Sequence, residues 1–446
     1  MARTDPEVTA REQVTRVPEV VEVEVGPVAH GGHCVARLDG QVVFVRHALP
    51  GERVRIRVTD GQEGDRFLRA DAVEVLEPSP HRVPAPCRYA RPGGCGGCDF
   101  QHADLPYQRE LKTAVVREQL ARLAKLDLDE GFAVEPLPPP TGVDDGLRWR
   151  TRVEFAVQPA ASATSADPAD LADPSDATGL GARPARAGLR RHRSHDIVEI
   201  DDCLIADQRI LASGVLDTSW TGCTGVDAVA ADEPADAVLV PLPERRGQKV
   251  PHVVQRVATP TWSAELTVGA RGFWQVHPAA ASTFVAHVLA ELDPQPGDRA
   301  LDLYAGVGLF ALALADAVGE TGAVLAVEAY PPAVEDARRN AKGLPQVELR
   351  TARVDRALKP LLRQGIRADL VVLDPPRTGA GKGVVTDIAA LEPRAIAYVA
   401  CDPAALARDT AYLAGHGYRL TRLRAFDAFP MTHHVECLAT FAPDAT

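Results

Sequence analysis

The feature that most constrains this chain is an alternation of short apolar strands with helices, which begins near residue 260. Four strand-like segments end in RALDLYAGVG, AVLAVEAY, ADLVVLDPP and AIAYVACDP, and a helical pattern follows each of them. Such an alternation predicts a parallel sheet that is covered on both faces. Because sheets of this kind bind ligands at the carboxyl ends of their strands, the residues at those ends are the first candidates for a site.

The first strand end carries a turn suited to a nucleotide-like ligand. In LDLYAGVGLF (301–310), Gly306 and Gly308 allow the backbone to approach a ligand closely. Glu328 ends the next strand, where an acid is placed to bind paired ribose hydroxyls. A Gly-rich turn with an acid could also bind NAD, but G-x-G-x-x-G is absent, and DPPR (374–377) at the fourth strand end favours methyl transfer.

Cys401 ends the last of these strands, in YVACDP, and is a candidate nucleophile. Carbon 5 of a pyrimidine is a poor nucleophile, and a thiolate that adds to carbon 6 makes it reactive by creating an enolate. The thiolate needs a lowered pKa, which we expect from the helix predicted to begin near Ala404. A base must then remove the proton from carbon 5. Glu436, flanked by apolar residues that would raise its pKa, is the candidate.

The N-terminal part of the chain is of a different kind. Five short strands between Val20 and Glu77, separated by turns that contain Gly, Asp and Pro, predict a small β-barrel. The runs VARLDGQVVFV and ALPGERVRIRV resemble a TRAM domain, an OB-like RNA-binding module. The predicted organisation is a disordered tail (1–17), the barrel (18–78), a central α+β domain (79–255) with a disordered insertion (159–184), and the Rossmann-like α/β domain (256–446).

Four of the eight cysteines have a spacing that suits a metal site. Cys87, Cys95, Cys98 and the distant Cys203 could bind an iron–sulfur cluster through four thiolates, and zinc fits the same ligands. The C-x3-C-x2-C spacing of radical enzymes is absent, so no radical chemistry is predicted. The remaining cysteines besides Cys401 are expected to be ordinary thiols.

The motifs DLYAGVGLF, DPPRTG, ACDPAALARD and HHVECLATF, in this order, resemble the RNA uridine-5-methyltransferase family. The resemblance implies that Cys401 is the nucleophile and Glu436 the proton acceptor. It also implies a set of residues that contact S-adenosylmethionine: Gln275 in GFWQVHP, Tyr304, Glu328 and Asp374. Through CGGCDFQH (95–102) and SHDIVEIDDC (194–203), it implies a [4Fe-4S] cluster rather than zinc on the four cysteines.

The same resemblance bears on the target base. Cytosine-5 enzymes usually have a Pro-Cys pair at the fourth strand end, where this chain has Pro375-Pro376. Enzymes that methylate amino groups usually have an aromatic residue after this motif, where this chain has Arg377. Both differences favour uracil. The TRAM-bearing branch of the family acts on large-subunit ribosomal RNA, so 23S rRNA is the expected partner.

The net charge of -12 is inconsistent with general nucleic-acid binding, but arginines gather locally. Two clusters could contact RNA phosphates and bases: Arg148, Arg150 and Arg152, and then Arg183, Arg186, Arg190, Arg191 and Arg193. A polar N-terminus and the lack of a long apolar stretch predict a cytoplasmic protein without a membrane span. We expect it to be a monomer. Alternatives left open are a transfer RNA uridine, an RNA cytosine or a protein as the target, and a non-catalytic RNA-binding assembly factor.

Overall fold

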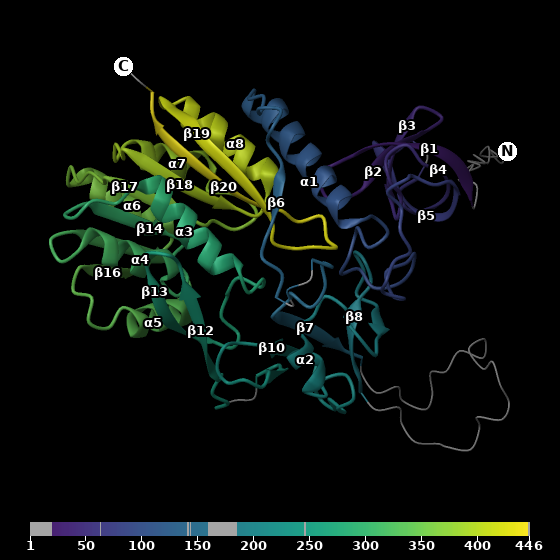
Figure 1. Ribbon diagram of the computed structural model, residues 1–446, viewed down its shortest axis with the longest axis horizontal. Coiled ribbons are helices and arrows are strands. Elements are labelled where there is room, and N and C mark those ends of the chain that lie inside the picture. Colours follow the sequence, from purple (N-terminus) through teal and green to yellow (C-terminus); the bar gives the residue numbers. More distant parts are fainter. Residues whose placement is uncertain are drawn as a thin grey trace, which may run out of the picture. The chain divides into compact units, whose positions relative to one another are not determined.

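The computed structural model describes residues 20–444, except 63, 141, 143, 159–184 and 245–246 (Figure 1). The tail (1–17) and the insertion (159–184) that the sequence predicts to be disordered lie outside these residues. The chain divides into two compact units, Met1–Arg82 and Val83–Thr446.

The first unit is a closed five-stranded barrel, which confirms the β-barrel prediction. Its strands, in the barrel order β1-β2-β3-β5-β4, are β1 (Val21–Val28), β2 (Cys34–Leu38), β3 (Gln41–Arg46), β5 (Phe67–Glu77) and β4 (Arg53–Asp60). Alternate residues fill the interior, as in β4, where Val54 and Ile56 are fully buried while Arg53 and Arg55 point outward to acidic partners. The alternating pattern of the sequence therefore encodes the two faces of the barrel wall.

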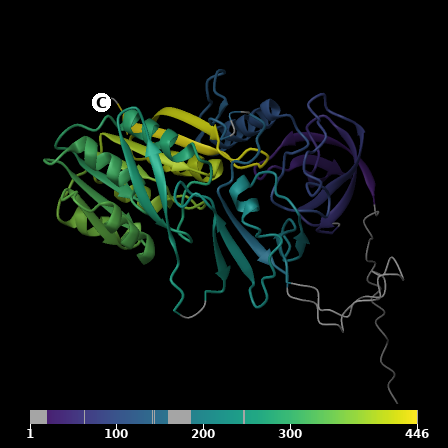
Figure 2. The same ribbon diagram turned by 60° about the horizontal axis from the view of Figure 1, so that its bottom comes forward.

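The second unit contains a smaller antiparallel sheet, drawn in teal in Figure 2. Its strand order is β11 (Val238–Leu242), β10 (Gly225–Val229), β7 (Arg152–Val157), β8 (Ala187–Arg190) and β9 (Ile197–Glu199). The short helix α2 (Gln208–Ala212) follows β9 in the chain. Strands β12 (His252–Ala258) and β13 (Ser263–Gly269) then form a separate two-stranded antiparallel ribbon.

An eight-stranded sheet forms the larger part of the second unit. Its order is β16 (Val347–Thr351), β15 (Ala323–Glu328), β14 (Arg299–Leu303), β17 (Leu370–Leu373), β18 (Ala395–Ala400), β20 (Glu436–Pro443), β19 (Tyr418–Asp427) and β6 (Val134–Pro136). The first five strands in this order are parallel, as predicted, and β20 runs antiparallel to both of its neighbours.

Helices cover both faces of this sheet (Figure 1). One core cluster contains α3 (Ala280–Leu292) and α4 (Leu309–Val318), and the other contains α6 (Val354–Arg363), α7 (Gly381–Ala389) and α8 (Pro403–Ala414). Helix α5 (Pro331–Asn340) packs against β13 and β16. Successive strand residues alternate between the two clusters, as Ala300 and Leu301 do. Because both faces of the sheet are buried, the sequences of its strands are continuous apolar runs.

Helix α1 (Leu105–Gln119) extends the second face, as the helical pattern over 104–126 predicts. It continues into one turn of π-helix, η1 (Leu120–Ala124), and both segments contact α8, beside which α1 lies in Figure 1. Strand β6 then pairs with β19 at the sheet edge. Both elements come from the sequence range assigned to the central domain, yet they pack on the eight-stranded sheet. Among the described residues, we find no helix with the length and apolarity needed to cross a bilayer.

Candidate active site

The strand ends of the large sheet meet at one edge, and the pairing register shows which side chains they bring together. Leu303 of β14 pairs with Val327 of β15 and with Leu373 of β17. The residues that follow these positions, Tyr304, Glu328 and Asp374, therefore lie along the same edge. All three are residues that the family resemblance assigns to S-adenosylmethionine.

The catalytic candidates lie further along this edge. Ala400 of β18 pairs with Cys437 of β20. Because the two strands are antiparallel, the next position along this register places Cys401 opposite Glu436. Glu436 is only 3% exposed, whereas Cys401 is partly exposed. The structure thus brings together the two residues proposed as nucleophile and base, although they are 35 positions apart in the sequence.

The turn after β14 has the backbone that its glycines predict. Gly306 and Gly308 have φ angles of 54° and 92°, and Tyr304 also has a positive φ of 64°. The φ of Gly308 is one that residues with a Cβ atom rarely adopt, so this position favours glycine. The Glu328 carboxylate accepts a hydrogen bond of 3.0 Å from the Gly306 amide, which ties the acid of β15 to the turn.

Buried carboxyl groups surround this edge. Burial raises the pKa of Asp374 to about 7, and burial, followed by the nearby Asp374 and Glu328, raises that of Asp302 to about 8. Burial and then Asp374 raise the pKa of Glu436 well above its ordinary value. Full ionisation of such a cluster is unfavourable without a compensating positive charge. The edge is therefore suited to a cationic ligand such as a sulfonium.

Gln275 also reaches this cluster. Its side-chain amide lies 3.4 Å from Asp374 Oδ2 and donates to it, and the residue itself is 8% exposed. Gln275 lies between β13 and α3, more than 90 residues before Asp374 in the sequence. The resemblance assigned it to the cofactor, and the structure places it beside the other candidate cofactor residues.

The environment of Cys401 corrects the expectation of a preformed thiolate. Burial is the largest effect, and together with Glu436 and Asp374 it raises the pKa of Cys401 to about 12, while Arg377 lowers it. Helix α8 does begin directly after this residue, but Asp402 caps it by accepting a 2.8 Å hydrogen bond from the Ala405 amide. The Asp402 carboxylate adds negative charge beside the thiol and raises its pKa further.

Asp409 of α8 is a site residue that the sequence reasoning did not single out. Its carboxylate accepts hydrogen bonds from the Tyr398 hydroxyl at 2.8 Å and from the Ala380 and Gly381 amides at 2.7 and 3.1 Å. These contacts hold the loop that follows DPPR against β18. Its position within the quoted ACDPAALARD motif was the available signal.

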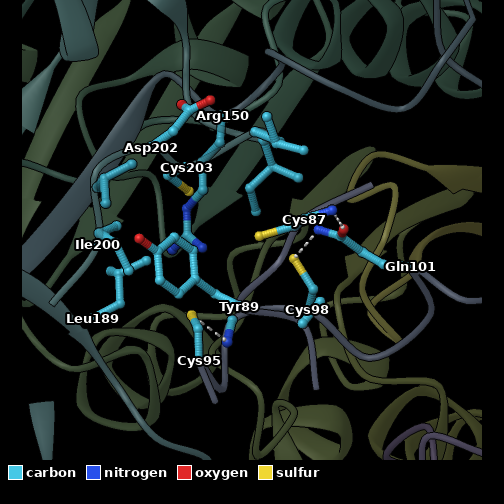
Figure 3. Close-up of a pocket in the computed structure, with 15 residues that line it drawn as sticks. Cys87, Tyr89, Cys95, Cys98, Gln101, Arg150, Leu189, Ile200, Asp202 and Cys203 are labelled. Carbon is cyan, nitrogen blue, oxygen red and sulfur yellow. Dashed lines mark hydrogen bonds between the residues drawn. The ribbon is translucent and has the colours of Figure 1, made fainter. Parts of the chain in front are cut away.

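The four cysteines proposed as ligands line one cavity of about 50 Å³, together with Arg150 and other residues. Their sulfur atoms point into it from separate stretches of chain (Figure 3). The Gly97 amide donates to Cys95 Sγ at 3.3 Å, and Gln101 donates to Cys98 Sγ at 3.2 Å. Within the described ranges, no three His, Cys, Asp or Glu side chains are arranged to hold a metal ion.

The arginines of the first cluster make contacts within the protein. Arg148 donates to the Asp202 carboxylate and to the Cys203 carbonyl, and Arg150 lines the cysteine cavity. Arg152 donates to two backbone carbonyl groups, and burial lowers its pKa to about 10. These partly exposed guanidinium groups thus have partners within the protein, and their contact with RNA stays a prediction.

The second arginine cluster is exposed where the structure describes it, at Arg186, Arg190, Arg191 and Arg193. Arg183 lies outside the described residues.

Comparisons with known proteins agree with this geometry. The TRAM domain matches residues 14–73, and the tRNA (Uracil-5-)-methyltransferase family matches residues 270–441. An RNA methyltransferase of Streptomyces avermitilis is 48% identical over 96% of this chain and 99% of its own length. An RNA methyltransferase of Bifidobacterium longum is 37% identical over 97% of this chain and 98% of its own length. The chain belongs to the TRAM-bearing RNA uracil-5-methyltransferase family. It is therefore an S-adenosylmethionine-dependent RNA methyltransferase.

A solved structure shares the overall fold of this methyltransferase. The tRNA (uracil-54, C5)-methyltransferase of Pyrococcus abyssi, in complex with S-adenosyl-L-homocysteine, superposes with a TM-score of 0.62. The alignment covers 94% of this chain and 99% of that one at 21% sequence identity. At this level of identity the likeness concerns the fold, and the site residues rest on the geometry described above.

The raised pKa of Cys401 predicts slow alkylation of the free protein. A thiol with a pKa of about 12 is thiolate in only about one part in 100,000 at neutral pH. We expect the rate of iodoacetamide labelling at Cys401, followed by peptide mass spectrometry, to rise about tenfold per pH unit to about pH 11. Cys401→Ser is the control that identifies the peptide. A rate that levels off near neutral pH would show that the thiolate is preformed.

Proposed function

We propose that this methyltransferase acts on carbon 5 of a uridine through a covalent adduct between Cys401 Sγ and carbon 6 of the base. The observation that carries the proposal is the register of β18 and β20, which places Cys401 opposite Glu436 at the edge that also carries the cofactor candidates. A nucleophile and a base on the same site edge match the two protein groups that this reaction needs.

The reaction then follows from the chain's own side chains. The Cys401 thiolate adds to carbon 6, which makes carbon 5 nucleophilic. Bound S-adenosylmethionine supplies the methyl group and a sulfonium charge. Glu436 accepts the proton from the methylated carbon 5, and the electrons of that C–H bond re-form the double bond and expel the Cys401 thiolate. The raised pKa makes Glu436 the stronger proton acceptor once it is ionised, and the positive charge of the bound cofactor favours that ionisation.

Entry into the reaction requires Cys401 to lose its proton. Arg377 is the cation that lowers the pKa of Cys401, and Glu436 and Asp374 are the acids that raise it. A cationic ligand beside these acids would offset their charge and favour the thiolate. Deprotonation is therefore coupled to cofactor binding in this proposal, and the free protein holds its nucleophile as a thiol.

We expect changes at Cys401 and Glu436 to stop the reaction at different stages. Cys401→Ala should form no adduct with RNA that contains 5-fluorouridine, whereas Glu436→Gln should still form it. With ordinary uridine RNA, Glu436→Gln should turn over about 10²–10⁴-fold more slowly and accumulate methylated RNA bound to protein.

The measurements are gel mobility of the adduct under denaturing conditions and transfer of a labelled methyl group. Cys223→Ser, which changes a thiol outside the described site, is the matched control. Wild-type protein that forms no 5-fluorouridine adduct would contradict the covalent route.

We propose 23S rRNA as the substrate by the resemblance to the TRAM-bearing branch of the family, since the chain matches both the TRAM domain and the uracil-5-methyltransferase family. The exposed arginines between Arg186 and Arg193 add positive charge that suits RNA phosphates.

Mapping 5-methyluridine in a strain that lacks the gene tests the substrate. We expect one uridine of 23S rRNA to lose its methyl group while transfer RNA is unchanged. Loss of 5-methyluridine from transfer RNA instead would identify a tRNA enzyme. Loss of 5-methylcytidine would identify a cytosine enzyme. Re-expression of the wild-type gene should restore the mark, and Cys401→Ala should not.

We also propose that Cys87, Cys95, Cys98 and Cys203 bind a [4Fe-4S] cluster. The shared cavity supports this proposal because all four cysteines line it. The N–H donors to Cys95 and Cys98 are of the kind that stabilises cluster thiolates. The same four thiolates would suit zinc, so the metal must be identified directly. The expected role is to support the fold around the cavity.

Metal analysis of protein purified without oxygen tests the cluster. We expect about four irons and four acid-labile sulfides per chain and no stoichiometric zinc. Cys98→Ser should lower the iron content, the sulfide content and the thermal stability. Cys223→Ser, outside the cavity, should leave all three unchanged. Stoichiometric zinc without sulfide would replace the cluster by a zinc site.

A further inference from the structure

The loop between β19 and β20, residues 428–435, leads directly into Glu436. It is attached to helix α1 and to Asp99, the residue that follows Cys98. The buried Lys112 of α1 donates to the Asp427 carboxylate at 2.5 Å and to the Phe429 carbonyl at 3.0 Å. Gln108, one turn earlier, accepts a 2.9 Å hydrogen bond from the Met431 amide. The start of the loop is thereby attached to α1.

The end of the loop is attached to Asp99. The Asp99 carboxylate accepts a hydrogen bond from the His433 backbone amide at 3.1 Å, and the same Oδ2 atom lies 2.6 Å from His433 Nδ1. The amides of Asp99 and Phe100 both donate to the Met431 carbonyl, at 2.9 and 3.0 Å. The Asp99 side chain is 9% exposed and that of His433 is 28% exposed. Backbone and side chain of His433 are thus both fixed by one carboxylate.

This attachment lies between the cysteine cavity and the reacting groups. Asp99 directly follows Cys98, and His433 lies three residues before Glu436. The rings of His433 and His434 are 4.1 Å apart, and His434 Nε2 lies 3.4 Å from the Arg377 guanidinium. Arg377 in turn is the cation that acts on the Cys401 thiol. The contacts therefore form a continuous path from the cavity wall to the nucleophile and the base.

We infer that Asp99 and His433 are positioning residues that set the start of β20, and with it the carboxylate of Glu436, for removal of the carbon 5 proton. The inference rests on the proposed function, because it assigns to Glu436 the role given there. A general base must lie within hydrogen-bond reach of the proton that it removes. The contacts of Asp99 with the amide and the ring of His433 fix the end of the loop that leads into β20, and small displacements of a catalytic group are costly.

The test separates proton removal from the steps before it. A 5-fluorouridine adduct requires only addition of Cys401 and methyl transfer, because the fluorine on carbon 5 cannot be removed as a proton. We expect Asp99→Ala to form this adduct at the wild-type rate. On ordinary uridine RNA, its kcat should fall about 10- to 100-fold with KM unchanged, and methylated RNA should accumulate as a covalent adduct.

Two further variants separate positioning from folding. Asp99→Asn keeps an oxygen that can accept from the His433 amide and should recover most of the turnover. His433→Phe keeps the ring volume and removes Nδ1. Like Asp99→Ala, it should form the 5-fluorouridine adduct at the wild-type rate but turn over ordinary uridine RNA more slowly. Asp129→Ala, at an exposed position, is the matched control, and iron content and thermal unfolding are measured for every variant.

Two outcomes would overturn the inference: unchanged turnover in Asp99→Ala and His433→Phe, or equal loss of adduct formation and turnover in both. If Asp99→Ala does not fold, His433→Phe decides alone. Failure of the wild-type protein to form the adduct would instead contradict the proposed function.

Discussion

The antiparallel pairing of β20 with β18 is the interaction on which the site depends. A parallel strand in this place would bring its end, rather than its start, to the edge where the other strands finish. Because β20 runs in reverse, its first residue, Glu436, meets Cys401 at the carboxyl end of β18. Buried pairs such as Val399 with Leu438 hold this register, and a slip by one residue would turn the carboxylate to the other face of the sheet.

The electrostatics of the edge follow from the same pairing. The strand ends gather acidic side chains in a buried place, where they raise one another's pKa and that of the thiol. The arrangement is unfavourable for the empty protein and is suited to a cation that carries a transferable methyl group. The carboxylates therefore serve recognition and reactivity together, since the charge that attracts the cofactor is also the charge that it neutralises.

Much of the fold and of the candidate site could be predicted from the sequence because local patterns encode them. The strand–helix alternation, the barrel and the residues at the strand ends all depend on short-range periodicity or on motifs, and the structure confirms their placement. Contacts between distant segments were missed, such as the pairing of β6 with β19 at the sheet edge and the attachment of His433 to Asp99. No local pattern encodes partners that are 291 and 334 positions away. The helix field expected at Cys401 failed for a related reason: burial and neighbouring acids outweighed one local element.

The thiol form of Cys401 also affects the chemical durability of the protein. Peroxides and disulfides attack thiolates, and their reaction with a protonated thiol is slow. The proposed nucleophile, whose pKa is raised to about 12, is therefore protected from oxidation to sulfenic acid in the free protein. The aspartate that caps the N-terminus of α8 beside it contributes to this protection, so in the proposed reaction the sulfur stays protonated until the cofactor is bound.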